Sequence, residues 1–222
     1  MSKLIPVIRT KKIKSMEDRE DALTVINEVY LKEKNWIRTA DDQIPEDIDK
    51  RVDISWFLVK FNNKPAGVLR ILFDPVLEFP QDLRVTLNKD LDIDKLKQIG
   101  KFAEIGRFMI LPVYRNYITV VLRLMRAAIK EVIERDYTHF ITDVFENETN
   151  SPYRFHTRIL GFEAIGKHLY GDLNCSCTRI ILTLDIIKNY QRLKEQKNKI
   201  FNKLTYGIRG IFEKKLSTRQ EI

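Results

Sequence analysis

Cysteines and long apolar runs are scarce in this sequence, and each scarcity excludes a class of protein. Only two cysteines, Cys175 and Cys177, occur in 222 residues, which is too few for a disulfide framework. A Cys-x-Cys pair alone lacks the further ligands that a zinc ion needs, so we expect structural thiols and no metal site. No apolar run approaches the ~18 residues expected of a membrane-spanning helix.

The N-terminus also lacks the apolar core of a secretory signal, because Lys11 and Lys12 interrupt its apolar pattern. We therefore expect a cytoplasmic protein. The sequence holds no internal repeat and no low-complexity segment, and its 44% of hydrophobic residues is enough to fill a core. Its length fits one large domain, or one domain with an appendage.

Positive charge is concentrated at the C-terminal end. The whole chain has a net charge of +8, yet residues 186–222 carry ten Lys and Arg against three Asp and Glu. Residues 1–185 are therefore almost neutral, with a balance of +1. This distribution argues against a nucleic-acid-binding body and for a tail that meets something anionic. We divide the chain into residues 1–185 and a basic segment, residues 186–222.

Apolar residues recur among the lysines of the basic segment, which leaves two interpretations open. One is a helix packed on the rest of the chain or on a second copy. The other is a basic amphipathic helix lying on an anionic membrane, which would place the protein on the inner face of the cell membrane. Basic side chains near such a surface gain roughly 1 kcal/mol each.

Apolar periodicity predicts an α/β (α+β) chain, with a mixed sheet and helices on both faces. We expect strands at residues 5–13, 55–61, 66–74, 102–111, 137–145 and 178–185, and a short strand at 83–87 is possible. The expected helices begin at the capping residue Ser15, at the turn after Pro112, and near Pro152, and the third ends at Gly161.

The stretch at residues 103–135 organises the rest of the chain. Its strand half carries Glu104 and Arg107 inside an apolar run, where burial would raise the pKa of a carboxylate and suit it to act as a general base. Residues three apart share a face of a strand only if a bulge intervenes. The alternative interpretation of Glu104 and Arg107 is a structural ion pair.

The turn after this strand carries Arg115 and Asn116 where the long helix should begin. Free N–H groups and the helix dipole favour an anion there, and Asn116 can cap the helix. Arg115 could instead be a solvated loop charge. Arg70 lies in the middle of an apolar strand, so it should be paired or face a cavity, because an isolated buried ion is very costly.

Two further groups of polar residues have open interpretations. Residues 36–53 hold six acids, which form either a solvated loop or a negative rim for an amine-bearing substrate, and a loop over a site can also act as a lid. The three histidines show no ligand spacing and are interpreted as structural; they are His139, His156 and His168.

Over roughly residues 20–185, the chain resembles the GNAT acyltransferases in the order of its elements. These elements are a strand, a Pro-x-Tyr-Arg turn, a long helix, a strand and a short helix that ends in Leu-Gly-Phe-Glu. That resemblance implies a mostly antiparallel, twisted sheet. In that family a glycine-rich turn holds the pyrophosphate of coenzyme A. Here the turn has no glycine, and side chains at Tyr117 and Ile118 would keep a pyrophosphate from the backbone. Thr157 stands where the family often has a tyrosine acid.

Glu104-Ile-Gly-Arg107 followed by Phe-Met-Ile-Leu-Pro resembles a strand of the acyl-homoserine-lactone synthases and of the N-acyl amino acid synthases. Tyr30 with Trp36 is similar to their aromatic segment near the N-terminus, although Ile26 stands where an arginine is usual. The acidic loop before the hairpin and the Gly-x-x-Arg strand also match, through Asp47, Asp49, Asp53, Gly67 and Arg70.

The resemblance implies an N-acyltransferase that moves a long fatty acyl group to the amine of an amino acid or a similar small molecule. The acyl donor would be a thioester of acyl carrier protein or of coenzyme A, with no metal, and the acidic carrier could dock on the basic segment. The implied catalytic residues are Glu104, as base directly or through one water, and Arg107. Implied substrate contacts are Arg70, Trp36, Tyr30 and Asp49, and implied phosphate contacts are Arg115 and Asn116. The alternatives are an acetyl-CoA-dependent N-acetyltransferase and a catalytically degenerate lipid-binding module.

Overall fold

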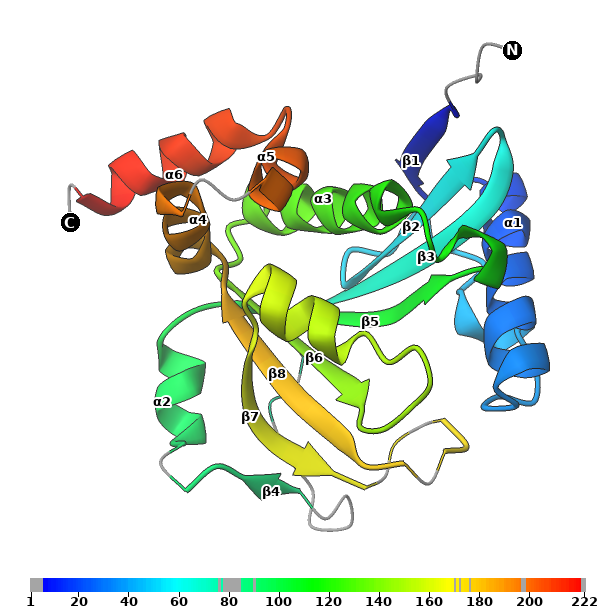
Figure 1. Cartoon of the computed structure of the whole chain (residues 1–222), viewed down its shortest axis with the longest axis horizontal. Coiled ribbons are helices and arrows are strands. Elements are labelled where there is room, and N and C mark those ends of the chain that lie inside the picture. The colour runs from blue at the N-terminus through cyan, green and yellow to red at the C-terminus, as the bar shows by residue number, and fades with distance from the viewer. Residues whose placement is uncertain are drawn as a thin grey trace. The chain divides into compact units, whose positions relative to one another are not determined.

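A computed structural model describes residues 6–75, 77, 85–89, 91–169, 171, 173–175, 177–196 and 199–220 (Figure 1). The first residue of the expected strand at 5–13, and residues 83 and 84 of the possible strand at 83–87, lie outside these ranges. The chain divides into two compact units. The first unit comprises Met1–Leu72 and Gly106–Ala128, and the second comprises Phe73–Ile105 and Ile129–Ile222.

Strands of the first unit follow the order β1-β2-β3-β5. They are β1 (Ile8–Lys12), β2 (Ile54–Phe61), β3 (Lys64–Phe73) and the second half of β5 (Phe102–Ile110). β2 pairs antiparallel with both β1 and β3. Asn62 and Asn63 turn the β2–β3 hairpin in the left-handed region, with φ of 49° and 64°, which two-residue hairpin turns require. This hairpin joins the two strands that were expected at residues 55–61 and 66–74.

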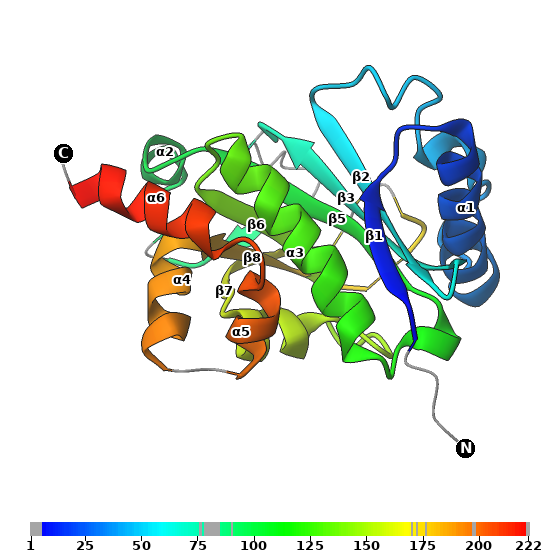
Figure 2. The same ribbon diagram turned by 90° about the horizontal axis from the view of Figure 1, so that it is seen from above.

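Helices of the first unit begin at the predicted cap. Ser15 Oγ accepts a hydrogen bond from the N–H of Asp18 at 3.2 Å and starts α1 (Met16–Ile26). The chain then continues as a π-helix, η1 (Asn27–Glu33), and later forms a short 3₁₀ turn, η2 (Asp41–Gln43). The apolar side chains on one face of α1 and η1 are buried: Ala22, Val25, Ile26, Val29 and Tyr30. α1 and the first part of α3 (Ile118–Glu134) lie on opposite sides of strands β1–β3 (Figure 2).

Strands of the second unit follow the order β5-β6-β8-β7-β4. They are the first half of β5, β6 (His139–Phe145), β8 (Arg179–Asp185), β7 (Glu163–His168) and β4 (Thr86–Leu87). β5 and β6 are parallel, and the other described pairs of this unit are antiparallel. The expected mixed, mostly antiparallel sheet is thus confirmed.

Two elements of the second unit lie outside the sequence-based expectation: α2 (Ile93–Gln98) and β7. The predicted short helix is present and takes a π-helical form in η5 (Phe155–Leu160). Gly161 ends it with φ of 88°, the left-handed conformation that was predicted for this residue.

The described residues of the basic segment form three helices, α4 (Ile186–Glu195), α5 (Lys199–Thr205) and α6 (Arg209–Gln220). Most of its apolar side chains are buried: Ile186, Ile187, Tyr190, Leu193, Phe201, Leu204, Ile208 and Phe212. The Tyr190 ring stacks on Phe212 with centroids 4.1 Å apart and also contacts Phe201 at 5.1 Å. This burial favours the packed interpretation, and contact with a membrane stays a prediction. Within the described residues, no helix is both long enough and apolar enough to span a bilayer.

Candidate functional site

Glu104 lies at the end of the β5–β6 ladder. Three parallel pairs are described, and the last joins Glu104 to Ile141. One residue further, the hydroxyl of Thr142 donates to the carbonyl of Ile105 at 2.7 Å, so a side chain occupies an acceptor of the β5 backbone. The Glu104 side chain is partly buried. The predicted base therefore stands where backbone pairing gives way to a side-chain contact.

Paired residues in neighbouring strands share a face of the sheet, and the contacts of the second unit agree. The rings of the paired residues Phe102 and His139 stack at 4.8 Å. Since side chains alternate along a strand, Glu104, Ile141 and Asp143 lie on this same face. An apolar cluster also lies there: Leu77, Leu96, Phe102, Ile141, Ile165 and Ile181.

Asp143 is fixed by two basic side chains. Its Oδ2 lies 3.2 Å from Nε2 of His168 and 3.2 Å from Nη1 of Arg179, which donates a hydrogen bond. The guanidinium of Arg179 also lies over the Phe145 ring at 4.9 Å. Burial alone would raise the pKa of Asp143, but the hydrogen bond with His168 and the charge of Arg179 hold it below its ordinary value. We name Asp143, His168 and Arg179 the Asp143 cluster.

Sequence reasoning missed the Asp143 cluster and interpreted His168 as structural. A signal was present, since Asp143 and Arg179 are charged residues inside apolar strands, like Arg70. The sequence did not show that β6, β8 and β7 are neighbours, because β7 was not expected.

Arg107 lies in the first unit and has an unusual backbone. Its φ of 50° is left-handed, which costs free energy in a residue other than glycine and breaks the regular strand conformation at this residue. Its Nε donates to Oε1 of Gln43 at 3.0 Å, and its guanidinium lies 5.6 Å from the centre of the Tyr30 ring. Tyr30 in turn contacts Trp36 edge to face, with ring centroids 5.4 Å apart.

The first unit thus brings three predicted residues together: Tyr30, Trp36 and Arg107. Tyr30 belongs to the π-helix η1. π-helices are rare in proteins, and those that do occur are often found at functional sites. Gln43 was missed, because a polar residue in an acidic loop gives no sequence signal for a partner on β5.

Arg70 and Asp49 also lie in the first unit. Arg70 is partly buried and stands opposite the fully buried Trp56 in the β2–β3 register. Asp49 is exposed and lines an open pocket of about 390 Å³ beside the start of α1. The pocket is lined by residues of both charges and by apolar residues: Lys14, Ser15, Met16, Glu46, Asp47, Ile48, Asp49 and Lys50.

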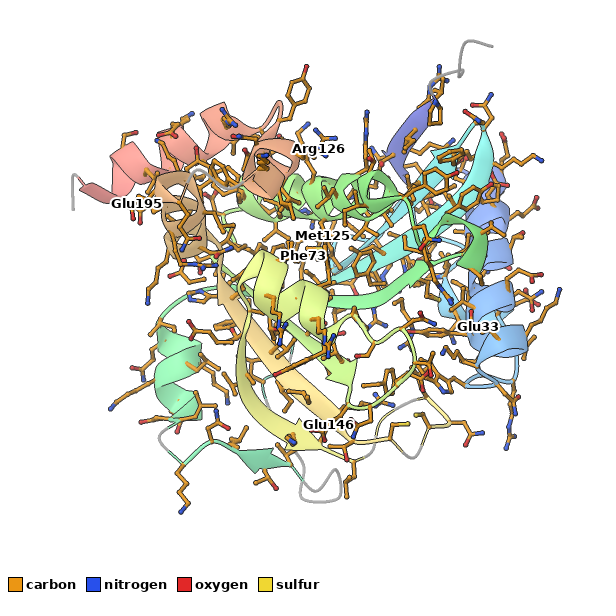
Figure 3. All side chains as sticks on the ribbon, in the orientation of Figure 1. Glu33, Phe73, Met125, Arg126, Glu146 and Glu195 are labelled. Atoms are coloured by element: carbon orange, nitrogen blue, oxygen red, sulfur yellow. The ribbon has the colours of Figure 1, made fainter. Side chains whose placement is uncertain are left out.

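Arg115 follows the 3₁₀ turn η4 (Pro112–Tyr114) and forms a bidentate pair with Glu33, with N–O distances of 3.0 and 2.5 Å. Its Nε donates to the carbonyl of Ile110 at 3.1 Å. The hydrogen bond from Arg115 lowers the pKa of Glu33, against the opposing effect of partial burial. Glu33 lies at the end of the helix that α1 and η1 form (Figure 3). A donor phosphate would have to compete with this carboxylate for Arg115.

The start of α3 differs from the prediction by one residue. The helix begins at Ile118, so Tyr117 rather than Asn116 occupies the position directly before it. Tyr117 and Ile118 are 46% and 40% exposed, and the Tyr117 ring contacts Phe61 at 4.8 Å. This turn therefore carries bulky, exposed side chains at positions where a glycine-rich turn would carry none.

A metal centre finds no support in the described part of the chain, where no group of three or more His, Cys, Asp or Glu residues is placed to hold an ion. Cys175 and Cys177 are partly buried free thiols.

Comparisons with known proteins identify the fold. No model of a known protein family matches the chain, and no curated protein matches it. Among solved structures, FeeM, an N-acyl amino acid synthase from uncultured soil microbes, is similar over 84% of this chain and 95% of its own, with a TM-score of 0.60 and 14% identity.

Two further solved structures are similar. NAA60 of Arabidopsis thaliana in complex with acetyl-CoA covers 81% of this chain and 99% of its own, with a TM-score of 0.57 and 12% identity. An N-acetyltransferase of Staphylococcus aureus Mu50 covers 82% and 99%, with a TM-score of 0.54 and 14% identity. The chain therefore has the GNAT acyltransferase fold, as its sequence indicated.

Proposed function

We propose that the protein is an N-acyltransferase that moves a long-chain fatty acyl group from a thioester to the amine of an amino acid or a similar small molecule. The observation that carries this proposal is the position of Glu104 in the GNAT fold, at the end of the β5–β6 ladder and on a partly apolar face. The likeness to an N-acyl amino acid synthase supports the choice of acceptor.

The reaction needs one base. At neutral pH an amine is mostly protonated, and Glu104, directly or through one water, takes the proton that blocks its lone pair. The neutral nitrogen then attacks the thioester carbonyl, the C–N bond forms, the C–S bond breaks, and the thiol leaves with a proton. In the first unit, the partly exposed Trp36 offers aromatic surface to a substrate while the buried Tyr30 supports its ring, and Arg107 offers a charge that Gln43 orients.

The turn before α3 supports a carrier-bound donor over coenzyme A. Tyr117 and Ile118 are bulky residues at positions where glycine would let a pyrophosphate approach the backbone, and Arg115 is paired with Glu33. The phosphopantetheine arm of acyl carrier protein has a single phosphodiester, which needs fewer contacts with the backbone of this turn than a pyrophosphate does.

The test is an assay of the purified protein with acetyl and long-chain thioesters of acyl carrier protein and of coenzyme A, each with the twenty amino acids. We expect free thiol and an acylated amino acid, seen by mass, with the long-chain carrier thioester preferred. Absence of thiol release above background with every pair would refute the proposal. The lipids that accumulate in an expressing bacterial host would report donor and acceptor together.

Glu104→Gln should lower kcat by about 10²–10⁴-fold, because an amide cannot take the proton. The matched control is Glu146→Gln, since Glu146 pairs with Lys167 at 2.6 Å just after β6 and has no assigned role. Figure 3 shows Glu146 at this end of β6. Near-normal turnover of Glu104→Gln would remove Glu104 from the mechanism.

A second candidate is an acetyl-CoA-dependent N-acetyltransferase, favoured by the similarity to a structure that holds acetyl-CoA. The same assay separates the two, because acetyl-CoA would then outcompete the long-chain thioesters. A third candidate, a lipid-binding module without catalysis, predicts a stable lipid complex and no turnover.

A further inference from the structure

Arg115 already holds an anion, the carboxylate of Glu33. Nη1 and Nη2 of Arg115 donate to Oε1 and Oε2 of Glu33 at 3.0 and 2.5 Å, so the two planar groups meet edge to edge. The third nitrogen, Nε, donates to the carbonyl of Ile110 at 3.1 Å. A phosphate binds a guanidinium through the same two-point geometry. Glu33 therefore occupies the edge of Arg115 that a phosphate would use.

The pair lies within reach of solvent. The side chains of Glu33 and Arg115 are each 25% exposed, and both residues belong to the first unit. The hydrogen bond from Arg115 lowers the pKa of Glu33, so the carboxylate is ionised at neutral pH. An anion that approaches Arg115 from solution thus meets a fixed negative charge as well as the guanidinium.

A second cation keeps the Glu33 carboxylate in place. Nζ of Lys34 lies 3.5 Å from Oε1 of Glu33, and the same ammonium group lies 5.7 Å from the centre of the Trp36 ring. Figure 3 shows Glu33 at the end of the helix that α1 and η1 form. The carboxylate therefore keeps a basic neighbour when an incoming anion weakens its contact with Arg115, and its charge stays beside the turn.

The two classes of thioester differ in the charge that they bring to Arg115. Coenzyme A carries a pyrophosphate, with two adjacent charged phosphates, while the arm of acyl carrier protein carries one phosphodiester. The Coulomb energy is proportional to the product of the charges, and charges closer than a Debye length of about 10 Å are only partly screened. Glu33 therefore opposes a pyrophosphate more strongly than it opposes a phosphodiester.

We propose that Glu33 is a specificity-determining residue that favours thioesters of acyl carrier protein over thioesters of coenzyme A. This inference rests on the proposed N-acyltransferase function and names the residue that selects the donor. Glu33 acts by occupying Arg115 and by holding negative charge beside the turn, and it has no part in proton transfer. Loss of its charge should change the choice of donor and leave the chemical step unchanged.

The experiment compares Glu33→Gln with the wild-type protein, using the same long acyl group on acyl carrier protein and on coenzyme A. We expect KM for the coenzyme A thioester to fall by about fivefold, an effect of the size that one partly exposed charge produces. For the carrier thioester, KM should stay within about twofold and kcat should stay at the wild-type value. Glu28→Gln is the matched control, because it removes the same charge from η1 at a residue that pairs with Lys32, and it should change neither KM.

A binding measurement separates this inference from the proposed function. By calorimetry, Glu33→Gln should bind coenzyme A about fivefold more tightly than the wild type, and should bind pantetheine, which has no phosphate, equally well. The double variant Glu33→Gln/Arg115→Gln should lose this gain, because the guanidinium that holds the phosphates is gone. If Glu33→Gln does not fold, Glu33→Ala removes the same charge and should give the same results.

An unchanged ratio of the two KM values would overturn the inference, while wild-type turnover would leave the proposed function standing. Equal tightening of coenzyme A and pantetheine would overturn it as well, because the effect would then not depend on phosphate. A gain in coenzyme A binding that persists in the double variant would show that Arg115 is not involved. A wild-type protein without turnover would instead remove the proposed function, and the calorimetry would still show whether Glu33 opposes phosphate.

Discussion

His156 shows how one buried side chain can set the pH dependence of stability. The residue is 1% exposed, its Nδ1–H donates to the carbonyl of Pro152 at 3.0 Å, and its ring meets Phe162 edge to face at 5.0 Å. Burial lowers the pKa of His156 from 6.5 to about 4, although the hydrogen bond to Pro152 opposes the change. The folded protein therefore keeps this histidine neutral where an unfolded chain would protonate it.

The contribution of His156 to stability should be complete above pH 6.5 and should decline as the pH falls to about 4. In that window the unfolded state binds a proton that the folded state does not, so the free energy of unfolding should fall by about 3 kcal/mol. Urea unfolding at several pH values measures this decline. His156→Leu should be less stable at pH 7, because it loses the hydrogen bond, and should lack this part of the decline. An identical pH profile in both proteins would contradict the assignment.

At the scale of elements, Gly67 holds β3 close to β5 within the first unit. A methyl group at this position would lie 2.7 Å from the carbonyl oxygen of Met109 and 2.5 Å from Cδ1 of Ile110. Backbone cannot move aside as a flexible side chain can, so glycine is required here by close approach rather than by its torsion angles. This gives a packing reason for the glycine of the Gly67-x-x-Arg70 pattern.

Gly67→Ala should destabilise the protein by about 1–3 kcal/mol, because the two strands must separate to admit the methyl group. Gly210→Ala in α6 is the matched control, since a methyl group there meets nothing within 4 Å. That control should be neutral or more stable by about 0.5–1 kcal/mol, as alanine favours helix over glycine. Thermal or urea unfolding of both variants decides the matter, and a Gly67→Ala protein as stable as the wild type would show that the strands yield.

The elements that local sequence predicts well are those whose signals lie within the element. The β2–β3 hairpin follows from the Asn62-Asn63 turn, the end of η5 follows from Gly161, and the start of α1 follows from Ser15. β7 was missed because it contains a glycine and depends on pairing with β8. The π-helical form of η1 was missed because no local residue pattern distinguishes it from an α-helix.

At the scale of the whole molecule, the predicted site residues fall into both units, because β5 passes from one unit to the other between Ile105 and Gly106. Sequence reasoning found Glu104 and Arg107 from their place in an apolar run. It could not find Gln43 or the Asp143 cluster, because their partners are distant in sequence. Contacts such as Arg107 with Gln43 depend on the folded chain and not on local pattern.

The basic segment provides the last prediction, that the protein meets an anionic membrane. Most apolar side chains of α4, α5 and α6 are buried, so the exposed side chains of the segment are mainly charged, together with Tyr206, which is 75% exposed. Deleting the segment would remove buried side chains such as Tyr190 and Phe212, and the loss of their packing would obscure the result. Charge reversal at exposed lysines is the sharper change, and Lys199 and Lys203 are suitable because both are exposed.

The double variant Lys199→Glu/Lys203→Glu should bind vesicles of phosphatidylcholine and phosphatidylglycerol at least tenfold more weakly than the wild type, since each basic side chain contributes roughly 1 kcal/mol near such a surface. Cosedimentation at low salt measures the binding, and added salt should weaken the wild-type interaction because screening shortens the reach of the charges. Lys64→Glu, at an exposed lysine at the start of β3, is the control and should bind like the wild type. If the wild-type protein does not bind these vesicles, or if the double variant binds them as tightly as the wild type does, the membrane is excluded as the partner of this segment.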